Sequence, residues 1–208
     1  PDLQRLAPAL MAPGLCIAEH KCAGAEATLG LPAMDPREAY AAGARAIVLS
    51  AASIGGAIRE AWIPYLVAAL EAGLDIISGA HDRLGNNSQL RRAAEAHGRR
   101  LIDVRTPPPD LPIATGRRRR GKRLLTVGTD CALGKKYTAL AVAEAFRARG
   151  LDADFRATGQ TGIMIAGRGI PIDAVVSDFV AGAAEMLSPD ADPAHWDVIE
   201  GQGSLFHP

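Results

Sequence analysis

Alanine-rich stretches with helical spacing alternate with short apolar runs along most of this chain. In four places such a stretch ends in a glycine, and an apolar or β-branched run follows almost at once; these glycines are Gly43, Gly73, Gly98 and Gly150. Glycine suits the left-handed residue that closes a helix, because it has no Cβ to clash. Short helix-to-strand connections repeated in this way are typical of βαβ crossovers. The pattern therefore predicts an α/β fold built on parallel sheets.

Helix starts are predicted by the residues that precede the apolar spacing. Asp35, Pro36 and Glu38 have the spacing of a capping box with proline at the first helical position. Further along the chain, Asn87 and Ser88 are alternative N-cap residues for a second helix. Both positions favour helices that lead into the predicted strands.

A break between the repeated units falls between residues 106 and 124. Three consecutive prolines begin it, and proline disfavours helices and central strands alike. We therefore predict a Rossmann-like N-terminal domain at residues 1–106, a linker rich in proline and arginine at residues 107–123, and a P-loop-like domain at residues 124–208. The basic run at residues 117–123 is interpreted either as a solvated part of the linker or as a contact to ligand phosphates.

Composition limits the classes of function. Apolar residues make up 48% of the chain and charged residues 22%, which are the proportions of a globular protein. The 23 basic and 23 acidic residues balance, which argues against a nucleic-acid partner. No apolar run reaches the roughly 18 residues that a membrane span requires, so we expect no membrane partner. Three cysteines are too few for a disulfide framework, and we expect a cytoplasmic protein.

Residues 124–138 carry the most informative motif. An apolar strand leads into a loop that contains Gly128 and Gly134, then into Lys135 and a helix with apolar residues at i, i+3, i+4 and i+7 spacing. Such a loop points backbone N–H groups at an anion, and the helix N-terminus and the lysine add positive charge. We therefore predict a phosphate-binding loop. The predicted ligand-binding residues are Gly128, Thr129, Asp130, Gly134, Lys135, Lys136 and Thr138.

Two features separate this loop from the common nucleotide-binding P-loop. Five residues, rather than four, lie between Gly128 and Gly134. Lys136 occupies the position of the Ser or Thr whose hydroxyl normally holds Mg²⁺, and the next hydroxyl, that of Thr138, lies on a different face of the helix. We therefore expect an anion that is bound without a metal ion. Lys136 is equally consistent with an exposed helix residue.

Other candidate residues follow the predicted strands, because ligands of parallel sheets bind at the carboxyl ends of strands. Glu200 comes directly after an apolar run and is a candidate general base, or else a loop carboxylate that caps backbone N–H groups. Gln160 and Thr161 lie in a loop rich in hydrogen-bond donors. Arg83 and Arg156 are candidate clamps for a substrate carboxylate. Each arginine is also consistent with a surface ion pair.

Three segments together resemble one known family. They are residues 128–135, which include Gly-Thr-Asp-Cys and Gly-Lys; residues 152–162, Asp-Ala-Asp-Phe-Arg-Ala-Thr-Gly-Gln-Thr-Gly; and residues 197–208, Asp-Val-Ile-Glu-Gly-Gln-Gly-Ser-Leu-Phe-His-Pro. They are similar to the D-glutamate N-acetyltransferase-like family, long catalogued as a domain of unknown function, with an N-terminal Rossmann-like and a C-terminal P-loop domain. The resemblance implies that members extend beyond residue 208, so we expect an incomplete P-loop domain.

The resemblance implies an enzyme that transfers an acetyl group from acetyl-CoA to the amino group of a D-amino acid such as D-glutamate. The phosphate loop would then anchor coenzyme A, and Glu200 or Asp130 would accept a proton from the small-molecule substrate. The loop is also similar to that of dethiobiotin synthetase, which implies an ATP- and Mg-dependent ligase or kinase. A nucleotide- or coenzyme A-binding module without catalysis is a further alternative. Alanine-rich helices on small domains also favour a homo-oligomer.

Overall fold

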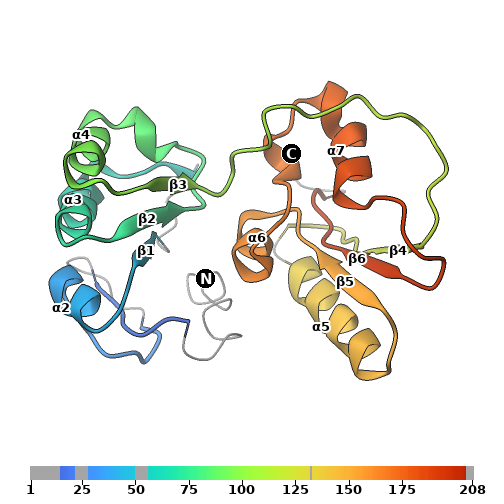
Figure 1. Ribbon diagram of the computed structural model, residues 1–208, viewed down its shortest axis with the longest axis horizontal. Helices are drawn as coiled ribbons and strands as arrows, with labels where there is room; N and C mark the ends of the chain where they lie inside the picture. The colour runs from blue at the N-terminus through green and yellow to red at the C-terminus, as the bar shows by residue number, and fades with distance from the viewer. Residues whose placement is uncertain (1–14, 22–27, 50–55, 132, 205–208) are drawn as a thin grey trace. The chain divides into compact units, whose positions relative to one another are not determined.

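The computed structural model describes residues 15–21, 28–49, 56–131 and 133–204. The chain divides into two compact units, Pro1–Arg105 and Thr106–Pro208. Each unit contains its own parallel β-sheet with helices between consecutive strands (Figure 1). The prediction of an α/β fold with parallel sheets is therefore confirmed.

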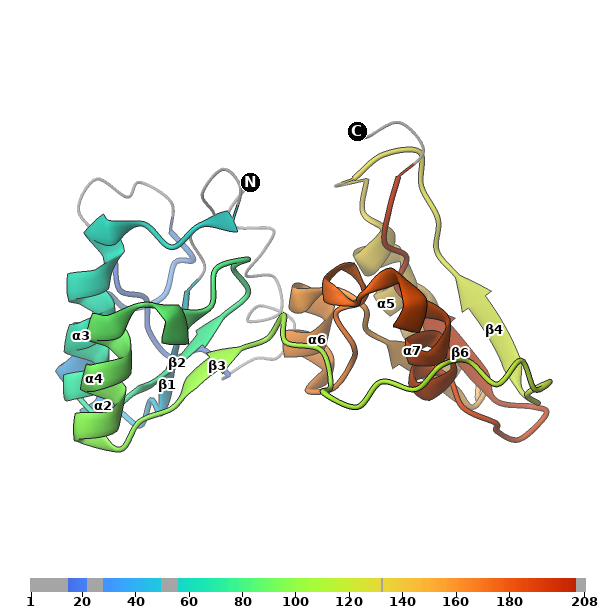
Figure 2. The same ribbon diagram turned by 90° about the horizontal axis from the view of Figure 1, so that it is seen from above.

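The N-terminal unit holds a three-stranded sheet in the order β1–β2–β3, and both strand pairs are parallel. Helices α3 and α4 pack side by side against this sheet, as Figure 2 shows. The described elements of this unit are α2 (Pro36–Ala41), β1 (Ala46–Leu49), the 3-10 turn η3 (Glu60–Trp62), α3 (Ile63–Glu71), β2 (Asp75–Ser78), the 3-10 turn η4 (Leu84–Asn86), α4 (Ser88–His97) and β3 (Leu101–Asp103).

Side-chain caps fix where α2 and α4 begin. The Asp35 carboxylate accepts the N–H groups of Arg37 and Glu38 at 2.8 and 2.9 Å. The Glu38 carboxylate in turn accepts the N–H of Asp35 at 2.9 Å, which completes the predicted capping box. Asn87, rather than Ser88, caps α4 by accepting two backbone N–H groups. These caps satisfy N–H groups that a helix cannot pair internally, so local sequence sets both helix starts.

The core of the N-terminal unit lies between the sheet and the two helices. Leu66 and Leu70 of α3, Ile76 of β2 and Leu90 of α4 belong to one cluster, and each is at most 3% exposed. Complete burial of a side chain of this size contributes about 1.5–3 kcal/mol. Packing of these side chains therefore stabilises helices that are too short to be stable alone.

The C-terminal unit holds a sheet in the order β4–β6–β5, and both strand pairs are parallel. Because all three strands run in the same direction, the loops that follow them meet at one edge of the sheet. The described elements are β4 (Lys122–Leu125), α5 (Lys135–Ala148), β5 (Ala153–Arg156), α6 (Gln160–Ala166), the 3-10 turns η5 (Ile172–Ala174) and η6 (Ser177–Phe179), α7 (Val180–Leu187) and β6 (Trp196–Ile199).

Helix α5 covers β5 and β6 with the apolar face that the sequence predicts. Ala139, Val142, Ala143 and Phe146 all belong to the cluster that surrounds the fully buried Val198 of β6. Figure 1 shows α5 running alongside β5. The two alanines let the helix approach the sheet closely, and this fixes the N-terminus of α5 relative to the strand ends.

Three arginines of the basic run contact other parts of the C-terminal unit. Arg119 donates to two carbonyls in the last turn of α7 and to the carbonyl of Ser188. Arg123 donates to Ser188 Oγ at 2.7 Å, and Arg120 pairs with Asp190 at 2.8 Å. Cations at a helix C-terminus satisfy its unpaired carbonyls. These three arginines therefore connect residues 119–123 to the end of α7 and to the segment that follows it.

Gly182 of α7 lies directly against the main chain of Pro112. A Cβ on Gly182 would overlap the Pro112 carbonyl oxygen. We therefore expect Gly182→Ala to lower the free energy of unfolding by about 1–3 kcal/mol, the usual effect of overpacking, as measured by urea denaturation. Gly85→Ala is the matched control, because its new methyl group would meet no atom within 4 Å. Equal unfolding midpoints for the two variants would contradict this close contact.

Candidate functional site

The loop after β4 forms the first wall of the candidate site. It ends at Gly134, whose φ of 98° is left-handed, and α5 begins with Lys135. The Lys135 ammonium donates to the carbonyl oxygen of Asp130 at 2.7 Å. Its aliphatic chain lies along Gly128, where a Cβ would approach the Lys135 Cδ to 3.3 Å. The lysine therefore lies across its own loop, with its charge beside the loop's main chain.

Thr126 joins this loop to the end of β6. Its N–H donates to the carbonyl of Ile199 at 3.1 Å, and its Oγ1 accepts the N–H of Gly201 at 3.1 Å. A Cβ on Gly201 would overlap the Thr126 carbonyl oxygen, so this contact requires glycine. Ser204 Oγ adds a bond to the carbonyl of Thr129 at 3.1 Å. The loops after β4 and β6 are consequently held against each other by main-chain contacts and by the hydroxyl groups of Thr126 and Ser204.

Glu200 lies where the loops after β5 and β6 meet, and its side chain is buried. Its Oε2 accepts the N–H groups of Thr158 and Gly159, each at 3.0 Å. Gly162 of α6 makes room for it, because a Cβ there would overlap the same oxygen. Burial raises the pKa of Glu200, although the two N–H groups and the charge of Lys136 oppose that rise. The capping geometry that the sequence left as an alternative is therefore present, in a carboxyl group whose pKa is raised.

Lys136 and Thr138 lie on the first turn of α5. The Lys136 ammonium lies over the Tyr137 ring at 4.3 Å from its centroid, and its charge acts on Glu200. Thr138 is exposed. The cation that replaces the usual metal-binding hydroxyl therefore interacts electrostatically with the acid that follows β6.

Arg156, at the end of β5, pairs with acidic groups of its own unit. Its Nε donates to Asp197 Oδ1 at 2.5 Å, and a terminal nitrogen lies 3.3 Å from Asp154. His195 lies between two carboxylates, with Nδ1 at 2.8 Å from Asp152 and Nε2 at 3.2 Å from Asp197. Burial alone would lower the pKa of His195, but the hydrogen bonds to these two carboxylates outweigh it and raise the pKa. Arg156 therefore belongs to a charge network centred on the buried Asp197, the Asp197 network.

The remaining predicted residues are distributed over both units. Thr161 is buried in the first turn of α6, and Gln160 begins that helix. Arg83 lies in the N-terminal unit near Asp103, whose pKa is raised by burial while the N–H of Leu84 and the charge of Arg83 oppose that rise. The structure thus brings the phosphate loop, Glu200 and the start of α6 together within one unit.

Three residues of this arrangement were absent from the sequence-based set. Thr126 and Thr158 make the hydrogen bonds that join the loops, and Asp197 organises the charge network. His195 directly precedes β6, and Asp197 lies two positions further along the chain. This spacing places two side chains on one face of an extended segment, and it was the signal that the sequence offered. The two threonines carry no such signal, because only the strand order β4–β6–β5 brings their loops together.

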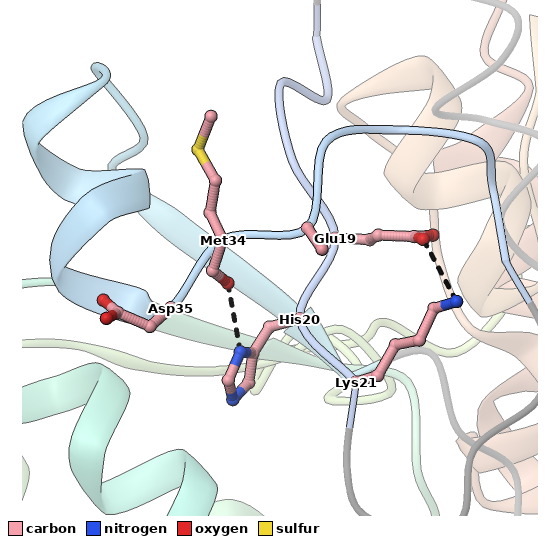
Figure 3. A pocket seen from close by; sticks show the side chains of 6 residues that line it. Glu19, His20, Lys21, Met34 and Asp35 are labelled. Carbon is pink, nitrogen blue, oxygen red and sulfur yellow. Dashed lines mark hydrogen bonds and ion pairs between the residues drawn. The ribbon is translucent and has the colours of Figure 1, made fainter.

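A separate cavity of about 330 Å³ lies in the N-terminal unit. Glu19, His20, Lys21, Met34 and Asp35 line it, and Figure 3 shows Glu19 paired with Lys21 and His20 beside the Met34 carbonyl. Glu19 pairs with Lys21 at 3.4 Å, and His20 Nδ1 lies 3.0 Å from the Met34 carbonyl. The residues predicted from the sequence do not line this cavity, so we place the candidate site in the C-terminal unit.

Over the described ranges, no group of three or more His, Cys, Asp or Glu side chains is arranged to hold a metal ion. In the same parts of the chain, no helix has both the length and the apolar character of a membrane span.

Comparison with protein families gives two matches. Residues 20–107 match a family described as "Domain of unknown function (DUF1611_N) Rossmann-like domain". Residues 112–208 match "Domain of unknown function (DUF1611_C) P-loop domain". The predicted Rossmann-like and P-loop folds are therefore confirmed.

Relatives with this architecture include proteins with a named activity. A protein named D-glutamate N-acetyltransferase from Tritonibacter scottomollicae is 53% identical over 195 residues, which are 94% of this chain and 59% of that protein. One of the same name from a Pseudoalteromonas species is 47% identical over 194 residues, 93% of this chain and 58% of that protein. A crystal structure of a DUF1611 family protein from Anabaena variabilis matches with a TM-score of 0.76 and 38% identity, over 86% of this chain and 53% of the other. This chain thus spans somewhat more than half the length of these relatives.

The raised pKa of His195 predicts a stability that depends on pH. A histidine whose pKa is higher in the folded than in the unfolded chain contributes fully below its unfolded pKa, ordinarily 6.5, and the contribution disappears as pH rises through the folded pKa. We therefore expect the difference in free energy of unfolding between the unsubstituted protein and His195→Gln to narrow as pH rises above 6.5, measured by urea titrations across that range. His97→Gln on α4 serves as the control. A difference that is independent of pH would refute this role for His195.

Proposed function

The chain belongs to the DUF1611 family, and on that premise we propose that it transfers an acetyl group from acetyl-CoA to the amino group of D-glutamate. The observation that carries the proposal is that the lysine-bearing loop after β4 lies beside the buried carboxyl group of Glu200. Thr126 binds the N–H of Gly201 next to Glu200, and Glu200 accepts an N–H of the loop after β5. The names of the two curated relatives indicate that acetyl is the group transferred and that D-glutamate is its acceptor.

The loop after β4 suits coenzyme A, which carries a pyrophosphate and a further phosphate group. Backbone N–H groups of the loop, the N-terminus of α5 and the Lys135 ammonium all favour an anion. Lys136 occupies the position at which a P-loop nucleoside triphosphatase has a metal-binding hydroxyl, and its ammonium group supplies a positive charge there. We therefore propose that Gly128, Thr129, Asp130, Gly134 and Lys135 hold the phosphates and that Lys136 replaces a divalent ion.

Glu200 is the proposed proton acceptor. A substrate ammonium must lose one proton before its nitrogen can attack, and a carboxyl group whose pKa is raised by burial is better matched to that step than an ordinary one. The neutral amine then forms a C–N bond to the thioester carbonyl carbon, and the C–S bond breaks. The second N–H proton passes to the leaving sulfur, which departs as the free thiol. Asp130, an exposed residue whose carboxylate accepts the N–H of Cys131 at 2.7 Å, is less suited to this role.

The substrate's two carboxylates require cationic partners. We propose that the donors of Gln160 and Thr161 bind these carboxylates, while Arg83, the first of the two arginines that the sequence suggests, lies in the N-terminal unit. Arg156 pairs with Asp197 and Asp154, so its contribution to the substrate would act through the position of β5. A homo-oligomer remains part of the proposal.

Lys135→Met should weaken the binding of coenzyme A by roughly ten- to a hundredfold, which corresponds to one or two charge-assisted contacts. Isothermal titration calorimetry of the purified protein measures this directly. Lys122→Met is the matched control, because Lys122 begins β4 at the opposite end of the strand from the loop. Equal affinities for the two variants would exclude the loop from coenzyme A binding.

The function itself is tested by incubating the protein with acetyl-CoA or with ATP and a panel of amino acids. We expect free thiol to be released in the presence of acetyl-CoA and D-glutamate. Phosphate released from ATP would instead favour the ligase or kinase alternative. Binding without either product would favour a non-catalytic module.

In the same assay, Glu200→Gln should lower kcat by about a hundredfold or more, the usual effect of losing a general base. The amide oxygen of glutamine can still accept the N–H groups of Thr158 and Gly159, so the loops should keep their positions. Glu144→Gln on the exposed side of α5 is the control. If both variants keep the activity of the unsubstituted protein, Glu200 is not the proton acceptor.

A further inference from the structure

The peptide unit between Glu200 and Gly201 is held on both of its edges by threonine hydroxyl groups. Its N–H donates to Thr126 Oγ1 at 3.1 Å. Its carbonyl oxygen accepts the hydroxyl of Thr158 at 2.6 Å. Thr126 follows β4 and Thr158 follows β5, and β6 lies between these two strands (Figure 1), so the hydroxyls reach the peptide from both neighbours of β6. We call this arrangement the threonine clamp.

Each hydroxyl of the threonine clamp has one donor partner and one acceptor partner. Thr126 Oγ1 also donates to the carbonyl of Ile199 at 3.3 Å. Thr158 Oγ1 also accepts the Nε2 of Gln202 at 3.0 Å. A hydroxyl has a single proton to donate, so both protons are directed at main-chain carbonyls. The two threonines are 7% and 4% exposed, which keeps water from replacing these bonds.

The orientation of the clamped peptide controls the direction of the Glu200 side chain. A peptide unit is planar and rigid, so holding both of its edges fixes the bond that follows the Glu200 Cα. On the other side of that Cα, the Glu200 N–H donates to the carbonyl of Arg156 at 3.0 Å. The Cα–Cβ bond therefore has one direction, and the carboxyl group at its far end meets the N–H groups of Thr158 and Gly159.

The threonine clamp also lies against the lysine of the phosphate loop. A Cβ on Gly201 would overlap the Thr126 carbonyl oxygen, and it would lie 3.5 Å from Lys135 Cδ. The ammonium group of Lys135 binds the carbonyl of Asp130. The main chain beside the buried acid is thus packed directly on the side chain that we expect to bind phosphate.

We propose that Thr126 and Thr158 are positioning residues, which hold the Glu200 carboxyl group in the direction from which it accepts the substrate's proton. This inference rests on the proposed function, and it adds two groups that act through Glu200. Proton transfer requires the acceptor within hydrogen-bond reach of the proton, and a displacement of about 1 Å can lower a rate about a hundredfold. A clamp on the main chain fixes that position before a substrate binds.

The test replaces each hydroxyl with a methyl group of nearly the same shape. Thr126→Val and Thr158→Val should each lower kcat for thiol release by about ten- to a hundredfold, because one edge of the peptide is no longer held. The Kd for coenzyme A, measured by calorimetry, should stay unchanged. Thr126→Ser and Thr158→Ser keep the hydroxyl and should restore kcat. Thr115→Val is the matched control, because that hydroxyl likewise donates to one group, on Glu185, and accepts another, from Arg117, but at α7.

Combination with Glu200→Gln separates positioning from a purely structural role. If Thr126 acts through Glu200, adding Thr126→Val to a protein that already carries Glu200→Gln should cause no further loss of kcat. A general defect of the fold would lower kcat by the same factor in both backgrounds, and that result would overturn the proposal. Circular dichroism establishes that each variant is folded in the assay, and Thr158→Val supplies the same comparison if Thr126→Val does not fold.

A titration of the Glu200 carboxyl group, followed by NMR of its carbon resonance, distinguishes this inference from the proposed function. Burial raises the pKa of Glu200, so a side chain released toward solvent in Thr126→Val should have a pKa nearer its ordinary value. Lys136, whose charge acts on the same carboxyl group, is present in both proteins.

Unchanged titration, or unchanged kcat in both valine variants of an active protein, overturns the inference and leaves acetyl transfer intact. Absence of thiol release from the unsubstituted protein contradicts the proposed function, and a shifted titration in Thr126→Val then still supports the threonine clamp as the device that holds Glu200.

Discussion

The burial of the Glu200 carboxylate is the constraint on which the site of the C-terminal unit depends. A carboxyl group removed from water must be given hydrogen-bond donors, and here the donors are the main-chain N–H groups of Thr158 and Gly159. Those amides belong to the loop after β5, whereas Glu200 follows β6, so one side chain fixes the distance between two loops. Thr126 makes the equivalent connection from the loop after β4. The phosphate loop, the acid and the start of α6 therefore form one continuous set of contacts.

Sequence alone was sufficient for the main elements and for the P-loop fold of the C-terminal unit. The glycines that end helices, the capping box at Asp35 and the apolar face of α5 are local signals, and each describes a structure formed by neighbours in the chain. The acid after β6 was also predictable, because parallel strands place such residues at one edge. What the sequence left open was which of two roles Glu200 plays, since the capping interaction joins residues more than 40 positions apart.

Charged residues were the part that sequence reasoning described least well. The arginines of residues 117–123 suggested a solvated linker or a ligand contact, and Arg156 suggested a clamp for a carboxylate. In the structure, three arginines of the run bind the end of α7 and the segment after it, and Arg156 pairs with Asp197. A charge pattern shows how many ions a segment carries, but the partners of those ions are set by tertiary packing. Only the fold distinguishes a cation that faces a ligand from one that satisfies the protein's own carbonyls.

The hydrogen bonds of the Arg123 side chain determine whether lysine could replace this arginine. Its guanidinium contacts the hydroxyl and carbonyl of Ser188, the carbonyl of Pro189 and three carbonyls within its own segment. All of these acceptors are neutral, so the attachment relies on the number and direction of N–H bonds more than on Coulomb attraction. Salt screens such bonds far less than it screens an ion pair, and a lysine, with one nitrogen, cannot reproduce their fan-like spread. In this part of the molecule the guanidinium acts as a multidentate cross-link between distant stretches of backbone.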